Sequence, residues 1–162
     1  IKKALVSKIK SNNIGEYLTL EILESEKVSS FDTVNEFIND VKQFGVKIAI
    51  DDFGTGFSNY ENILNLNIDY IKIDGSLIRK INEDIYLNLI KSIVLFSKQQ
   101  NIKVVAEFVS DLKILRYVKN IEIDYSQGYY IGKPTHIHEL FGEENETTTK
   151  KDNWFNNKWH FK

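Results

Sequence analysis

VKIAIDDFGTGFS, residues 46–58, joins a short apolar run to two adjacent carboxylates and a glycine-rich turn. The run is rich in β-branched residues, which favour strands, and the glycines let the backbone turn tightly after it. Asp51 and Asp52 are therefore predicted at the end of a strand, where carboxylates can hold a hard metal ion facing a phosphate. A solvated surface turn has the same composition, so the rest of the chain must decide between the two interpretations.

Four other short runs share this character and alternate with stretches whose apolar residues recur at helical spacing. The predicted strands are 17–20, 46–50, 70–73, 103–106 and 121–125. Helical spacing is clearest at Val34, Phe37, Ile38 and Val41, and again at Leu87, Ile90, Val94 and Leu95. This alternation indicates βαβ units that build a parallel sheet, so the predicted fold class is α/β.

The composition is that of a globular domain, with 162 residues, 42% hydrophobic and 27% charged. The chain has no cysteine, which excludes disulfides and thiolate metal sites. A net charge of −2 argues against a general surface for nucleic-acid polymers. No apolar run is long enough to span a bilayer, and we expect a cytoplasmic location, with membrane contact only through other parts of a parent protein.

The chain has no methionine and opens inside a predicted helix, so we interpret it as a fragment of a longer protein. Residues 1–141 carry the alternating pattern and are expected to form part of one domain. Residues 142–162 begin as a polar, threonine-rich linker and end in a basic aromatic tail.

Polar side chains stand at or just after the end of every predicted strand. In a parallel sheet or barrel these ends lie on one face, so we expect the side chains to converge on one site. Any single member could be a surface acid or one half of an isolated ion pair, but five strand ends in succession favour a shared site. The residues concerned are Glu21, Glu24, Asp51, Asp52, Lys72, Asp74, Glu107 and Gln127.

Four of these carboxylates would repel one another and an anionic substrate unless divalent cations lay among them. Oxygen ligands without His or Cys select Mg²⁺ or Mn²⁺ over zinc. Asp51 and Asp52 could serve two metals, and such a pair can activate water against a phosphodiester. Lys72 would hold the attacking water or neutralise phosphate charge. The predicted metal ligands are Glu21, Asp51, Asp52 and Glu107.

These motifs resemble those of the EAL-domain cyclic-di-GMP phosphodiesterases. EILES at 21–25 resembles the family's E-x-x-E-S, and DDFGTGFS at 51–58 resembles D-D-F-G-T-G-Y-S. DYIKID at 69–74 matches D-x-x-K-I-D, VVAE at 104–107 matches V-[IV]-A-E, and QGYYIGKP at 127–134 matches the closing Q-G-[YF] segment. The resemblance runs from about Tyr17 to about Phe141.

The resemblance implies a modified TIM (β/α)₈ barrel that converts cyclic-di-GMP to linear pGpG in bacterial signalling. Carried over by position, Glu21 and Asp51 would share one metal, and Asp51, Asp52 and Glu107 would hold the second. Lys72 would contact the catalytic water, with Lys72, Glu107 and Glu24 as the catalytic group.

The resemblance also implies roles for the surrounding loops. Glu24 would steady the loop at 53–58, which the family uses for assembly of the site and for dimer contact, so a homodimer is expected. Gly54, Thr55, Asp74 and Gln127 are assigned to the substrate.

The chain departs from the family pattern in two respects. Where the family has A-E-G-V-E, this sequence reads Ala106-Glu107-Phe108-Val109-Ser110, which replaces a glycine and a carboxylate. The namesake E-A-L segment and the next strand, with its asparagine ligand, are expected before Ile1. We therefore expect a partial barrel that lacks its N-terminal strands and is inactive as this fragment.

Two alternatives remain open at this stage. Because of Phe108 and Ser110, the domain could be a degenerate member that senses cyclic-di-GMP or binds a protein without hydrolysis. A TIM-barrel enzyme of another kind, such as an enolase-like proton abstractor, would need a dedicated base, and only Lys72 offers itself.

Overall fold

The structure is a computed structural model that describes residues 2–23, 31–55 and 60–135. Strands and helices alternate along these residues. The strands are β1 (Thr19–Leu23), β2 (Lys47–Phe53), β3 (Tyr70–Ile73), β4 (Lys103–Ala106) and β5 (Tyr125–Ser126). The helices are α1 (Lys2–Asn12), α2 (Phe31–Lys42), α3 (Tyr60–Leu64), α4 (Gly75–Ile78), α5 (Asp84–Gln99) and α6 (Leu112–Asn120), and a 3₁₀ turn spans Gly15–Tyr17.

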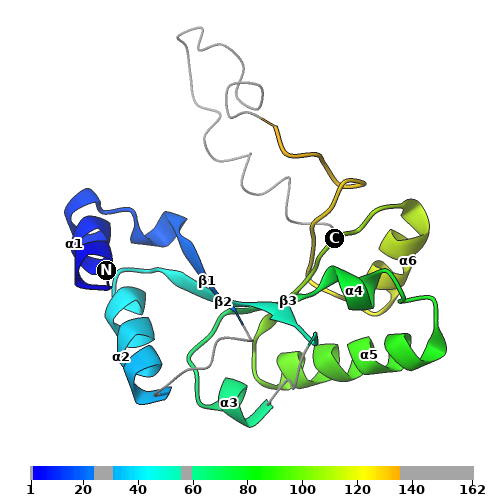
Figure 1. The fold of residues 1–162 in the computed structure, drawn as a ribbon, viewed down its shortest axis with the longest axis horizontal. Helices are drawn as coiled ribbons and strands as arrows, with labels where there is room; N and C mark the ends of the chain where they lie inside the picture. Colours follow the sequence, from blue (N-terminus) through cyan, green and yellow to red (C-terminus); the bar gives the residue numbers. More distant parts are fainter. Residues whose placement is uncertain (1, 24–30, 56–59, 136–162) are drawn as a thin grey trace, which may run out of the picture.

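The strands form one parallel sheet in the order β1-β2-β3-β4-β5, so sequence neighbours pair in space. Helices α2, α3 and α5 lie along one side of the strands (Figure 1). This is the arrangement of a partial TIM-type α/β barrel, and it confirms the predicted fold class. All strand carboxyl ends therefore lie at the same edge.

The core lies between the strands and the helices that cover them. Each strand from β2 to β4 contributes β-branched side chains that are almost wholly inaccessible to solvent, and α2 and α5 supply the facing residues. Fully or almost fully buried members include Ile38, Val41, Ile48, Ile71, Ile73, Ile90, Ile93 and Val104. Leu95, which the helical spacing placed with the core residues of α5, is instead 59% exposed.

Three predicted strands have wrong boundaries. β1 runs on to Leu23 and includes Glu21, and β2 runs on to Phe53 and includes Asp51 and Asp52, which were expected to follow these strands. The other two errors have identifiable reasons. The first strand begins at Thr19 rather than at residue 17, because Tyr17 belongs to the 3₁₀ turn that the Leu18 N–H to Gly15 oxygen bond closes. The fifth strand is only Tyr125–Ser126, because the amides of Ile121, Glu122 and Ile123 donate back to carbonyls of α6. An apolar run adjoining a helix end was thus mistaken for a strand.

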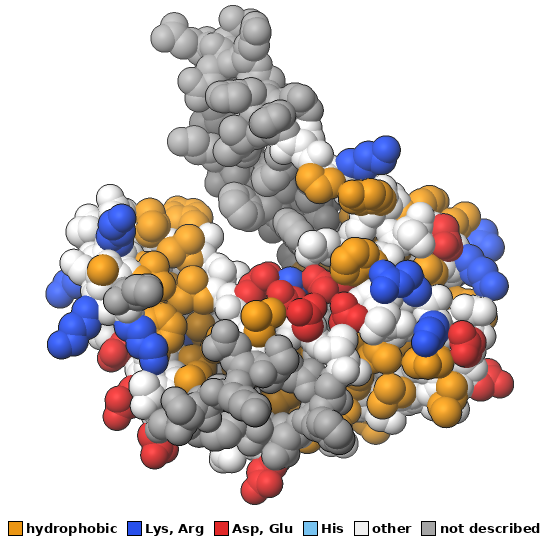
Figure 2. Space-filling view, viewed as in Figure 1, with side chains coloured by type: hydrophobic (Ala, Val, Ile, Leu, Met, Phe, Trp, Pro, Cys, Tyr) orange, Lys and Arg blue, Asp and Glu red, His pale blue; other side chains and the backbone are white. Residues whose placement is uncertain are grey.

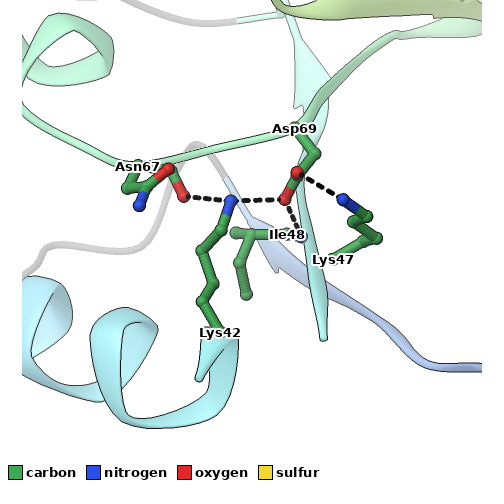
Figure 3. Close-up of polar contacts among 5 residues, drawn as sticks. All are labelled: Lys42, Lys47, Ile48, Asn67 and Asp69. Atoms are coloured by element: carbon green, nitrogen blue, oxygen red, sulfur yellow. Dashed lines mark hydrogen bonds and ion pairs between the residues drawn. The ribbon is translucent and has the colours of Figure 1, made fainter. Parts of the chain in front are cut away.

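The amino ends of the strands are fastened by Asp69, which lies just before β3. One of its carboxylate oxygens accepts the backbone N–H of Ile48 at 2.9 Å and the ammonium of Lys42 at 2.7 Å. The other lies 3.3 Å from Lys47 Nζ, and Lys42 also reaches the Asn67 carbonyl at 3.2 Å (Figure 3). Asp69 therefore ties β2, the end of α2 and the approach to β3 together, away from the strand ends that carry the predicted site.

Candidate metal centre

The two adjacent aspartates lie in an irregular part of β2. Regular pairing with β3 stops at Ile50 and resumes with Phe53 against Ile73, so the register shifts across Asp51 and Asp52. Asp52 has a φ of 56°, in the left-handed region that aspartate tolerates better than most residues. Adjacent side chains of a regular strand point to opposite faces, whereas a bulge re-aims one of them. The bulge explains how both carboxylates reach one site.

Lys72 is the centre of the site. It lies in β3 between the buried Ile71 and Ile73, and its residue is only 8% exposed. Its Nζ is 2.8 Å from Glu21 Oε1, 2.8 Å from Asp51 Oδ1 and 2.9 Å from Glu107 Oε1. Burial alone would lower the pKa of Lys72, but hydrogen bonds to these carboxylates raise that pKa above its ordinary value. The surrounding carboxylates therefore favour the protonated, cationic form of the lysine.

Glu107 follows β4 and is 6% exposed. Its backbone N–H donates to the Ile73 carbonyl at 3.2 Å, which fixes it beside β3. Burial raises the pKa of its carboxyl, and the contact with Lys72 lowers that pKa only in part. Asp51 and Asp52 add to the rise, because further negative charge nearby disfavours ionisation.

Asp51, Asp52 and Glu107 each offer a carboxylate oxygen, and these oxygens all lie within 4.8 Å of one another. Acidic side chains gather near the middle of this face of the molecule (Figure 2). A set of oxygen donors with more negative charge than one lysine can balance fits a hard divalent cation. Glu21 contacts Lys72 and is not part of the three-acid group within the described residues.

Within the described part of the chain, the side chains of the other predicted site residues form no hydrogen bond or ion pair with Lys72 or the three acids, apart from that of Thr55, which bonds to the Asp52 backbone. Asp74 accepts the Ser76 N–H at 2.8 Å and caps α4, so its carboxylate has a structural partner. The Thr55 hydroxyl donates to the Asp52 carbonyl at 3.0 Å, and Gly54 has a φ of 97°, which suits glycine alone. Gln127 is exposed, with its backbone bonded to Ala106 and Val109. Glu24 and residues 56–59 lie outside the described residues.

From the sequence alone, Phe108 is only a departure from the family pattern. In the structure its φ is 53° and its side chain is 56% exposed, directly after the buried Glu107. The guanidinium carbon of Arg79 lies 5.3 Å from the centre of the ring. Sequence reasoning had no signal for this contact with Arg79, because the two residues lie on separate loops.

Comparison with known proteins decides the family. The EAL domain family matches residues 2–134. This chain belongs to the EAL domain family. It is 42% identical over 130 residues to the cyclic di-GMP phosphodiesterase PdeA of Borreliella burgdorferi and covers 19% of that protein. It is 36% identical over 127 residues to the cyclic di-GMP phosphodiesterase PdeF of Escherichia coli and covers 17% of that protein. The matches take in 80% and 78% of this chain.

Solved EAL structures have the same fold. The MucR phosphodiesterase in complex with c-di-GMP matches with a TM-score of 0.76 and 27% identity, over 84% of this chain and 57% of that one. The EAL domain of Mycobacterium smegmatis DcpA matches with a TM-score of 0.79 and 25% identity, over 86% of this chain and 63% of that one. The chain thus spans less than a fifth of the two curated relatives and under two thirds of these structures.

Among the described residues, none of the helices combines the length and the hydropathy that crossing a bilayer requires.

Proposed function

We propose that this EAL chain supplies part of a divalent-metal site that hydrolyses cyclic-di-GMP to linear pGpG. The observation that carries the proposal is the group of Asp51, Asp52 and Glu107, whose carboxylate oxygens lie within 4.8 Å of one another. The buried Lys72 contacts two of them, Asp51 and Glu107. The phosphodiesterase names of the relatives and the c-di-GMP bound to MucR support the choice of substrate.

Asp51, Asp52 and Glu107 would hold the metal, with Mg²⁺ or Mn²⁺ as the ions that suit oxygen ligands. Glu21 is proposed as a further ligand, because its carboxylate already lies at Lys72, on the rim of the group. When bound, the ions would generate hydroxide from water and stabilise the leaving oxygen of the diester.

The protein's own charges prepare the site for this chemistry. Lys72 keeps its proton, so it offsets the repulsion among the carboxylates and can donate to a water or to a phosphate oxygen. The bulge at Asp51 and Asp52 would place two metal ligands at one strand end. Gly54, Thr55 and Gln127 lie on the adjoining loops, where we propose that they contact the substrate, and Asp74 would do so through α4, which it caps.

The test is hydrolysis by the parent protein that contains this chain, incubated with cyclic-di-GMP and Mg²⁺ or Mn²⁺ and analysed by chromatography for pGpG. Glu107→Gln and Asp51→Asn are expected to lower kcat by about a hundredfold or more, since each removes a metal ligand. Glu122→Gln is the matched control, because Glu122 is an exposed acid in the turn that precedes β5 and its partner is Lys98.

Two outcomes would redirect the proposal. Tight binding of cyclic-di-GMP without pGpG would assign the domain to sensing. Neither binding nor hydrolysis would overturn the substrate assignment. The 162-residue chain alone is expected to give no product, and turnover by it would contradict the proposal that the fragment is incomplete.

A further inference from the structure

Phe108 has a strained backbone conformation and an exposed ring, and neither feature stabilises the folded protein. A bulky residue with a φ of 53° is strained relative to the glycine that accepts such a backbone readily. Its ring is also 56% exposed, although it follows a residue that is almost wholly buried. Strained backbone positions cluster at binding and active sites, so the conformation of Phe108 points to a role in binding.

The ring is nevertheless held in one place. A Cβ added at Gly75 would lie 2.3 Å from Phe108 Cδ2, so the ring rests directly on the Gly75 backbone. The Arg79 guanidinium lies 5.3 Å from the ring centre, which is within the range of a cation–π contact. The next residue, Val109, donates its N–H to the Gln127 carbonyl at 2.9 Å and accepts from Tyr130 N at 3.1 Å. Phe108 therefore presents a pre-positioned, solvent-accessible aromatic surface.

The location of this surface connects it to the reaction. Phe108 is joined by one peptide bond to Glu107, whose Oε1 lies 2.9 Å from Lys72 Nζ within the acid cluster. In a nucleotide whose phosphodiester occupied that cluster, each base would lie one sugar away from the phosphate, and Phe108 exposes its ring directly after Glu107. An aromatic ring in that position is suited to stack on a base, and a purine offers the largest face for it.

We propose that Phe108, seated on Gly75 and flanked by Arg79, stacks on one purine base of the cyclic dinucleotide. The inference rests on the proposed function and adds a base-binding residue to it. The glycine of the general family pattern offers no such ring, so substrate affinity would depend on Phe108 in this protein.

The test compares Phe108→Leu with Phe108→Tyr in the parent protein, using cyclic-di-GMP hydrolysis. Leucine keeps apolar volume but lacks the flat π face, so KM is expected to rise about tenfold with kcat within about twofold. Tyrosine keeps the face, and KM is expected to stay close to the wild-type value. Gly75→Ala, which would displace the ring, is expected to raise KM. The double variant with Phe108→Leu is expected to have a KM close to that of Phe108→Leu alone.

A second readout detects the contact itself. The fluorescence of Phe108→Trp, measured against the wild-type protein by rapid mixing, is expected to be quenched by cyclic-di-GMP before turnover. Tyr17→Trp is the control, because Tyr17 is 74% exposed and precedes β1 at the opposite end of the sheet.

An unchanged KM in Phe108→Leu, or equal KM values for the leucine and tyrosine variants, would overturn the stacking role while leaving the hydrolase proposal intact. A wild-type protein that neither binds nor hydrolyses cyclic-di-GMP would overturn both.

Discussion

Asp69 and Asp124 hold the amino ends of two strands in the same way. Each lies directly before a strand and accepts the N–H of the second residue of the strand before it, Ile48 in one case and Val104 in the other, both at 2.9 Å. Each also pairs with the lysine at that strand's first position, at 3.3 and 2.7 Å. The same local device thus sets the spacing of β2 with β3 and of β4 with β5.

Asp69→Asn is expected to destabilise the protein more than Asp124→Asn. Asp69 has an additional ion pair with Lys42 at 2.7 Å, which joins the end of α2 to the sheet (Figure 3). Hydrogen bonds to charged groups contribute about 1.5–3 kcal/mol each, but the amide oxygen of asparagine can still accept the backbone N–H, so only part of this is lost. We expect losses of about 2 kcal/mol for Asp69→Asn and about 1 kcal/mol for Asp124→Asn. Urea denaturation measures both.

Glu122→Gln serves as the control, since its pair with Lys98 is exposed on both sides and should leave the midpoint unchanged. Equal losses at Asp69 and Asp124 would contradict the role assigned to Lys42.

The contribution of Asp69 should depend on pH in a defined direction. Burial raises the pKa of this carboxyl, but the hydrogen bonds from Lys42 and Ile48 more than offset it, so the folded-state pKa lies below 3.8. A lowered pKa stabilises the folded state above the unfolded-state value, and this stabilisation is lost as the pH falls through the folded-state value. The difference in unfolding free energy between wild type and Asp69→Asn should be constant from about pH 7 to pH 5 and shrink below about pH 4. A difference that grows on acidification would be the contrary result.

Lys72→Met should destabilise the metal-free protein strongly. The substitution leaves Asp51 and Glu107, with side chains 18% and 8% exposed, facing each other without the cation that separates them. Removing one partner of a buried ion pair costs about 3–5 kcal/mol, and the exposure of Glu21 places the expected loss near the lower end. Denaturation in EDTA measures it.

Restoring divalent metal should distinguish this charge effect from lost packing. A cation bound among the carboxylates stabilises the folded state by mass action, and it should do so more in Lys72→Met than in wild type because it replaces the missing positive charge. Equal shifts in melting temperature for the two proteins on addition of Mg²⁺ would rule out the proposed charge balance.

Asp52 can be tested for its two roles separately. Asp52→Asn keeps a side chain that tolerates the left-handed backbone at a φ of 56°, whereas Asp52→Ala does not. Both should weaken metal binding, but Asp52→Ala should lose about 1 kcal/mol more of metal-free stability. Calorimetric Mg²⁺ titration and urea denaturation provide the two measurements, and equal stability of the two variants would show that the bulge is unstrained.

The alternation of apolar runs with helical periodicity was sufficient to predict the parallel sheet, and the polar residues at the strand ends were sufficient to predict one shared edge. The sequence could not predict the register shift, because the pattern Ile50-Asp51-Asp52-Phe53 is equally compatible with a strand that simply stops. Ile121 and Ile123 were wrongly predicted to lie in a strand for a related reason. A β-branched run can also follow a helix, with its amides donating to the last helix carbonyls.

The roles of Asp69 and Phe108 depend on contacts between residues far apart in sequence. Lys42 lies 27 positions from Asp69, and Arg79 reaches Phe108 from another loop. Periodicity carries no information on such pairs. The metal roles of Glu21, Asp51, Asp52 and Glu107 stay predictions until metal binding is measured.

The irregular pairing of β2 shows that the two adjacent aspartates of the sequence do not by themselves make a metal centre. If the strand paired with β3 in regular register, one of the two aspartates would turn towards the helices while every acidic letter of the sequence remained. Changes at neighbouring positions that restore regular pairing could therefore silence a relative whose acidic residues are all retained. In this chain, the backbone at Asp52 is thus as much a requirement of the metal centre as the two acidic side chains.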